Sequence, residues 1–103
     1  MTFDIAHSAA AALDLDNMVH YIAFQLNNST TASNLLDEYE YRLSNLKDSP
    51  RFYGPARNER LARMGYHTFS FGNYIAFYKI DEKKNNVNII RVFNKKQDYL
   101  NYL

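Results

Sequence analysis

The chain has 103 residues, with 12 Lys and Arg, 11 Asp and Glu, no Cys and no Trp. Its 47% hydrophobic and 22% charged residues are typical of a globular protein and exclude collagen-like, low-complexity and wholly disordered architectures. The absence of cysteine excludes a disulfide framework and a thiolate zinc site. Asp4 stands where a signal peptide has basic residues, and no apolar stretch approaches the roughly 18 residues that span a bilayer. We therefore expect one cytoplasmic domain over residues 1–103, without a membrane partner.

The net charge of +1 conceals an asymmetry between the two halves of the chain. Residues 1–50 carry a net charge of −5, whereas residues 51–103 carry +6. Such an asymmetry has two interpretations. Either one surface of the fold faces a polyanion, or the two halves neutralise each other when they fold together.

Two helices are predicted in the first half. Alternating apolar and polar residues predict a short strand over residues 2–6, and Ser8 is a typical N-cap for the helix that follows. Apolar residues at helical spacing predict that this helix covers residues 9–26, before a polar cluster at 27–31. A second apolar stripe predicts a helix over 32–49 that Pro50 ends. Because the polar loop is short, we expect an antiparallel helical hairpin.

The second half predicts strands. Segment 51–64 follows Pro50 and contains Pro55, Gly54 and four arginines, so we expect an irregular basic connector with about one helical turn. The apolar period then changes from 3.6 to 2, which predicts strands over residues 65–71, 74–80 and 87–93. Gly72-Asn73 predicts a hairpin turn, and a basic loop leads into a short terminal helix. This order predicts an α+β fold, in which an antiparallel sheet carries the helical hairpin on one face.

Candidate chemistry gathers near the predicted strand ends. His67 begins a strand after the basic connector, and Lys95, Lys96 and Tyr99 follow the last strand. If these groups meet at one end of the sheet, they fit scission of RNA by its own 2′-hydroxyl. That reaction needs a proton acceptor, cations for the phosphate and an acid for the leaving group, but no cofactor or metal. The alternative is a basic strand end that only holds phosphate or an acidic partner.

Four segments of the chain carry a resemblance to a known family. They are residues 43–50, 64–67, 73–81 and 89–99, which read LSNLKDSP, MGYH, NYIAFYKID and IIRVFNKKQDY. In this order and spacing they resemble the RelE/ParE family of bacterial toxins from type II toxin–antitoxin systems, over nearly the whole chain. The resemblance implies a β-α-α-β-β-β fold, which the periodicity also predicts, and a cognate antitoxin as partner.

The resemblance implies two alternative activities. Members similar to RelE cut mRNA on the ribosome, whereas members similar to ParE inhibit DNA gyrase, and one fold supports both. The chain departs from the family at Gly65-Tyr66-His67, where Gly-Tyr-Arg is common, so His67 is a group that titrates near neutrality. It also has Lys95 and Lys96 where many members have an arginine pair. Lysine holds phosphate as a point charge without the arginine fork, which predicts a weaker phosphate clamp.

The leading hypothesis is a ribosome-dependent mRNA endonuclease that inhibits translation. The expected catalytic residues are His67, Tyr99 and Arg91, and the expected RNA-binding residues are Lys95, Lys96, Arg57, Arg60 and Arg63. Two other interpretations stay open: a non-enzymatic inhibitor of DNA gyrase, and a degenerate member that only binds antitoxin. For Arg91 the structural alternative is a strand-surface ion pair, and for the arginines of segment 51–63 it is a solvated connector.

Overall fold

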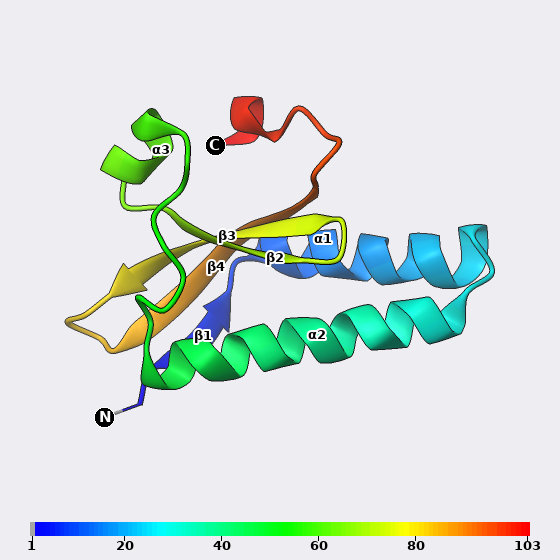
Figure 1. Ribbon diagram of the computed structural model, residues 1–103, viewed down its shortest axis with the longest axis horizontal. Helices are drawn as coiled ribbons and strands as arrows, with labels where there is room; N and C mark the ends of the chain where they lie inside the picture. Colours follow the sequence, from blue (N-terminus) through cyan, green and yellow to red (C-terminus); the bar gives the residue numbers. More distant parts are fainter. Residues whose placement is uncertain (1) are drawn as a thin grey trace.

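The computed structural model describes residues 2–103 and places a four-stranded sheet between two sets of helices (Figure 1). The strands are β1 (Asp4–His7), β2 (His67–Phe71), β3 (Tyr74–Asp81) and β4 (Asn86–Asn94). The helices are α1 (Ala9–His20), which continues as a π-helical turn (Tyr21–Gln25), α2 (Ser29–Asp48), α3 (Glu59–Arg63) and a terminal 3₁₀ turn (Tyr99–Tyr102). The α+β class and the predicted order of elements are confirmed.

Side-chain caps set the boundaries of the helical hairpin. The hydroxyl of Ser8 accepts a hydrogen bond from the Ala11 N–H, at 2.9 Å, as predicted for the N-cap of α1. Asn28 caps α2 in the same way through the Thr31 N–H, so α2 begins at Ser29, earlier than its apolar stripe indicates. Asn27 takes a positive φ of 50°, a conformation that ends helices. The loop is therefore shorter than the predicted polar cluster.

The strand order is β1-β4-β3-β2, and one pairing differs from the prediction. β2, β3 and β4 form the expected antiparallel meander, but β1 pairs with β4 in parallel. The turns of a meander impose antiparallel pairing on the strands they join. The whole hairpin of α1 and α2 and two further strands separate β1 from β4, so no turn constrains their relative direction. The sheet is therefore mixed at this edge.

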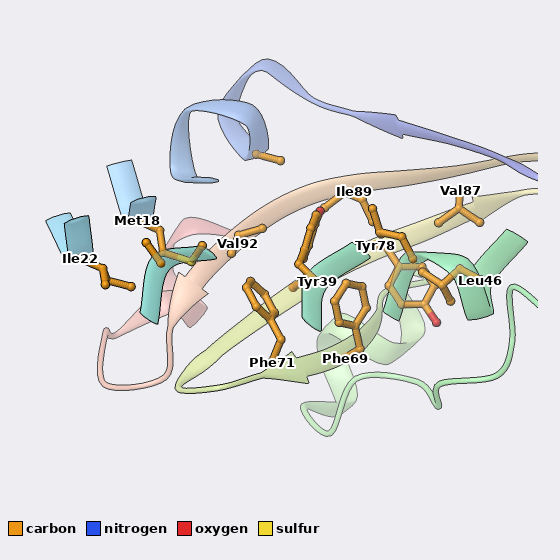
Figure 2. Close-up of a cluster of buried hydrophobic side chains, with 14 residues drawn as sticks. Met18, Ile22, Tyr39, Leu46, Phe69, Phe71, Tyr78, Val87, Ile89 and Val92 are labelled. Atoms are coloured by element: carbon orange, nitrogen blue, oxygen red, sulfur yellow. The ribbon is translucent and has the colours of Figure 1, made fainter. Parts of the chain in front are cut away.

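The main core lies between the sheet and the helical hairpin. Figure 2 shows Phe69 and Phe71 of β2 beside Tyr39 of α2, with ring centroids 5.7 and 4.9 Å from the Tyr39 ring. Tyr78 of β3 is fully buried in the same cluster. Burial raises the pKa of the Tyr39 and Tyr78 hydroxyls above the usual 10, so both stay protonated at neutral pH.

A smaller core covers the opposite face, which we call the open face. There Leu61 of α3 packs with Phe77 and Phe93, and Tyr99 of the terminal turn completes the cluster. Figure 1 shows α3 and the C-terminal segment together on this side of the sheet, across from α1 and α2. The open face is thus covered only by short elements, which leave room for a cavity.

Among residues 2–103, none of the helices combines the length and the apolar composition that a membrane span requires.

Candidate functional site

A cavity of about 600 Å³ opens on the open face, between the sheet, α3 and the C-terminal segment. Its wall includes Thr68 and Ser70 of β2, Arg57 before α3, and Lys95 and Tyr99 after β4. Three of the eight predicted site residues therefore line one cavity. Its lining within residues 2–103 contains no Asp or Glu, so the two cations give it a positive character.

A tight turn positions Lys95 at this cavity. The Lys95 N–H donates to the carbonyl of Asn73, at 2.8 Å, which ties the end of β4 to the β2–β3 hairpin turn. The Asn94 N–H donates to Gln97 Oε1 and the Lys96 N–H donates to Asn94 Oδ1, at 2.8 and 2.9 Å. Asn and Gln side chains stabilise turns through such bonds to the backbone. The sequence Asn94-Lys95-Lys96-Gln97 is therefore the signal for the turn that presents Lys95.

Arg57 is placed by the start of α3. Asn58 is the N-cap of this helix, since its Oδ1 accepts from the Leu61 N–H at 3.1 Å, and Leu61 is fully buried. The Ala56 N–H donates to the Tyr66 carbonyl at 2.9 Å, which fixes the preceding loop. Arg57 lies between these two anchors, is exposed, and forms no hydrogen bond or ion pair to any of residues 2–103.

Aromatic stacking holds Tyr99 in the cavity wall. Its ring stacks on Phe93, with centroids 5.6 Å apart and planes 17° apart, and lies 5.5 Å from the Phe77 ring. Arg60 donates from its guanidinium to the carbonyls of Leu100 and Leu103, both at 3.3 Å. Arg60 thus binds the terminal turn to α3. Arg60 is exposed, but its guanidinium is bonded to the chain's own carbonyls. The sequence had led us to expect a guanidinium that is free to contact RNA.

His67 lies on the other face of the sheet. It shares its strand parity with Phe69 and Phe71, which are buried against α2, because alternate side chains of a strand point to the same face. Its ring stacks on Tyr78 at 5.4 Å, and its Nδ1 is 3.3 Å from the carbonyl oxygen of Tyr53.

His67 is also at the wrong end of its strand for the predicted site. It pairs with Tyr78, whereas Lys95 bonds to Asn73 at the opposite end of the same hairpin. The two ends of β2, His67 and Phe71, are four residue steps apart, which is about 13 Å. The expected meeting of His67 with Lys95, Lys96 and Tyr99 is therefore not found. Strand register separates His67 from the Lys95 turn, and strand parity places it on the face opposite Tyr99.

Arg91 is neutralised by an acidic residue of α1. Its Nε and Nη2 donate to the carboxylate of Asp14 at 2.8 and 3.0 Å, and the Val92 N–H donates to the same carboxylate at 2.9 Å. The two side chains are only 26% and 16% exposed. Hydrogen bonding to Asp14 raises the pKa of Arg91 above its usual value. The structure thus shows the ion pair that was the structural alternative for Arg91.

The remaining predicted cations lie outside the cavity. Lys96 is exposed on the turn beside Lys95, and Arg63 lies 3.9 Å from Glu59 in an exposed pair one helical turn away. Exposed pairs of this kind contribute little to stability. Of the predicted RNA-binding set, only Arg57 and Lys95 converge.

Two groups of residues were not predicted. Thr68 and Ser70 were recognisable in principle, because alternation along β2 places them on the face opposite His67. Asp14 was not recognisable, because 77 positions separate it from Arg91. No group of three or more His, Asp or Glu residues that could hold a metal ion occurs in the part of the chain that the structure describes.

Residues 5–99 match the family described as the ParE toxin of the type II toxin–antitoxin system, parDE. This match covers most of the chain, and the protein therefore belongs to the ParE toxin family. It is a toxin of a type II toxin–antitoxin system, as the sequence segments led us to expect.

Two solved structures share this fold. The RelBE2 toxin–antitoxin complex from Mycobacterium tuberculosis has a chain with 22% identity and a TM-score of 0.60, over 91% of this chain and 99% of that chain. The chromosomal ParDE system from P. aeruginosa has a chain with 17% identity and a TM-score of 0.66, over 89% of this chain and 95% of that chain. At these identities the similarity concerns the fold alone. No curated protein matches the chain.

Proposed function

We propose that this toxin inhibits DNA gyrase by binding, without cutting RNA. The observation that carries the proposal is the separation of His67 from Tyr99 on opposite faces of the sheet. This is one of the alternatives that the sequence left open, and it replaces the endonuclease as the preferred interpretation.

RNA scission by the 2′-hydroxyl requires a base and an acid close to one phosphate, within hydrogen-bond reach of the groups that exchange protons. His67 and Tyr99 cannot serve one phosphate from two faces of a sheet. Arg91, the third expected catalytic residue, already has its charge balanced by Asp14. A binding role requires no such convergence and is compatible with the ParE description of the family.

The test measures both activities on the same purified toxin. We expect it to inhibit supercoiling of relaxed plasmid by gyrase and to leave mRNA intact on translating ribosomes. Cleaved mRNA with normal supercoiling would contradict the proposal. The variant His67→Gln, checked for folding by circular dichroism, should keep its inhibition of gyrase, since His67 faces the helical hairpin.

A second candidate is RNA cleavage in which Tyr99, not His67, moves the proton. It is favoured by one observation: Arg57, Lys95 and Tyr99 line the same cavity. The variant Tyr99→Phe separates the two candidates, because it removes only the hydroxyl and keeps the ring stacked on Phe93. Loss of mRNA cleavage in this variant would favour the ribonuclease, whereas unchanged inhibition of gyrase would favour binding.

We also propose that a cognate antitoxin neutralises the toxin, as in the two toxin–antitoxin systems that share its fold. Tyr21, Phe24 and Leu26 are exposed near the tip of the helical hairpin and would be covered by such a partner. Induction of the toxin alone should stop growth, and co-expression of the antitoxin should restore it. A toxin that causes no growth defect would instead be the degenerate member considered above.

A further inference from the structure

We propose that the cavity on the open face binds single-stranded DNA, with one phosphodiester between Arg57 and Lys95 and one unpaired base against Tyr99. The toxin would then contact the DNA of the gyrase–DNA complex as well as the enzyme. This inference rests on the proposed function, because gyrase is the target that brings opened DNA to the toxin.

The two cations suit a phosphodiester. Arg57 reaches the cavity from the loop before α3, and Lys95 from the turn after β4. Neither side chain is paired within residues 2–103, whereas Arg60 and Arg91 are both engaged in the protein. Unpaired cations around a cavity without carboxylates attract an anion, and the arginine fork can hold two phosphate oxygens.

Hydroxyl groups of β2 add neutral donors. Thr68 and Ser70 line the cavity, as does Phe69 between them, and their strand parity is opposite to that of Phe71, which is buried against α2. Neither hydroxyl has a hydrogen-bond partner among residues 2–103, so both are free to donate to phosphate or sugar oxygens. The donors thus come from three separate segments around one space.

The aromatic wall favours an unpaired base. The half-buried ring of Tyr99 is held by Phe93 and Phe77, so it presents a fixed surface. Bases of a single strand can stack on such rings, whereas the bases of a duplex are already stacked on one another. The volume of about 600 Å³ lies within the range that holds small ligands, about 300 to 1,000 Å³.

Binding is tested on the full chain without gyrase, by fluorescence anisotropy of labelled oligothymidylate at several salt concentrations. The double variant Arg57→Gln/Lys95→Gln should bind at least about tenfold more weakly. Its salt slope should fall by about 0.7, since the one lost phosphate contact contributes roughly 0.7 on a single strand. Tyr99→Leu should lose about tenfold through stacking.

The matched control is Lys83→Gln/Lys84→Gln, which removes the same charge from the exposed β3–β4 turn, at the other end of the hairpin from Lys95. It should change affinity by less than about twofold. Arg57→Lys/Lys95→Arg keeps both charges and should retain binding if the first double variant fails only through loss of charge. Thermal unfolding by circular dichroism verifies that each variant is folded.

Several results would overturn the inference. They are equal losses in the control and cavity variants, duplex DNA bound as tightly as oligothymidylate, and oligouridylate bound more tightly than oligothymidylate. The last result would assign the cavity to RNA. The supercoiling assay keeps this test distinct from that of the proposed function. If a cavity variant still inhibits gyrase as strongly as the wild type, only the DNA contact is overturned. If the wild-type toxin does not inhibit gyrase, the proposed function is overturned.

Discussion

Asp14 joins two distant elements through a single carboxylate. β1 ends at His7, so the edge of β4 beyond Ile89 has no strand beside it. Asp14 accepts the Val92 N–H there and holds the Arg91 guanidinium at the same time. One acidic residue of α1 thus replaces a missing strand and neutralises a cation.

We predict that Asp14→Asn lowers the free energy of unfolding by about 1–3 kcal/mol, because a largely buried guanidinium loses its counter-charge. Asp16→Asn removes the same charge from an exposed position of α1 and should change stability by less than about 0.5 kcal/mol. Urea unfolding of both variants measures the difference. Equal midpoints would show that the Asp14 pair contributes nothing.

His7 makes stability depend on pH. Its Nε2 lies 2.8 Å from the Tyr39 hydroxyl, and burial lowers its pKa below the usual 6.5, against the opposing charge of Glu40. The unfolded chain therefore binds a proton more readily than the folded one, so stability falls as the pH drops below about 6.5.

We predict a decrease in the free energy of unfolding between about pH 7 and pH 5.5, and a smaller decrease in His7→Gln. Glutamine keeps an acceptor for the Tyr39 hydroxyl but does not titrate. Urea unfolding at a series of pH values provides the measurement. An unchanged pH slope in the variant would assign the effect to other groups.

Among the elements, β2 has the greatest influence on the site. Its alternation sends His67, Phe69 and Phe71 toward α2 and sends Thr68 and Ser70 toward the cavity. The hairpin turn that follows fixes the register with β3, and Lys95 bonds to that turn. Any shift of this turn would therefore move Lys95 relative to the cavity.

Gly72 in this turn is expected to tolerate no side chain. It has a φ of +55°, and a Cβ there would come within 2.5 Å of Leu35 Cδ2. We predict that Gly72→Ala lowers the free energy of unfolding by at least about 1–2 kcal/mol, the usual penalty of the left-handed conformation. Gly54→Ala is the control, since a Cβ at Gly54 meets nothing within 4 Å. Thermal unfolding should separate the two, and equal stabilities would contradict the prediction.

In the folded molecule, the acidic and the basic residues predominate in different elements. Acidic residues predominate in the half that forms α1 and α2, and basic residues in the half that forms the meander, α3 and the C-terminal segment. Both interpretations of the asymmetry apply in part, because Asp14 neutralises Arg91 while Arg57 and Lys95 stay unpaired among residues 2–103.

The exposed apolar side chains predict that the free toxin self-associates. Phe24 is 72% exposed near the hairpin tip, beside exposed Tyr21 and Leu26. Sedimentation velocity should show dimers or larger species of the wild-type chain and mostly monomer for Phe24→Ser. Tyr41→Ser changes an exposed ring of α2 away from the tip and should leave association unaltered. A monomeric wild-type chain would refute this prediction.

Most of the fold was predictable because it depends on local signals. Caps at Ser8, periodicity in α1 and α2, and the Gly72-Asn73 turn each act within a few residues. The parallel pairing of β1 was missed because no turn joins it to β4. The early start of α2 was missed because the prediction relied on the apolar stripe, which begins at residue 32, and not on the N-cap at Asn28.

Periodicity and composition were enough to predict the fold class and the concentration of cations in the second half of the chain. The four segments that resemble the RelE/ParE family were enough to predict the family, which the match over residues 5–99 then showed. Which of these cations remain available depends on the folded structure. Arg91 pairs with Asp14, Arg60 bonds to the carbonyls of the terminal segment, and His67 faces the helical hairpin, whereas Arg57 and Lys95 line one cavity. The physical reason is that register, strand parity and long-range ion pairs depend on residues far apart in the chain, which no local pattern encodes.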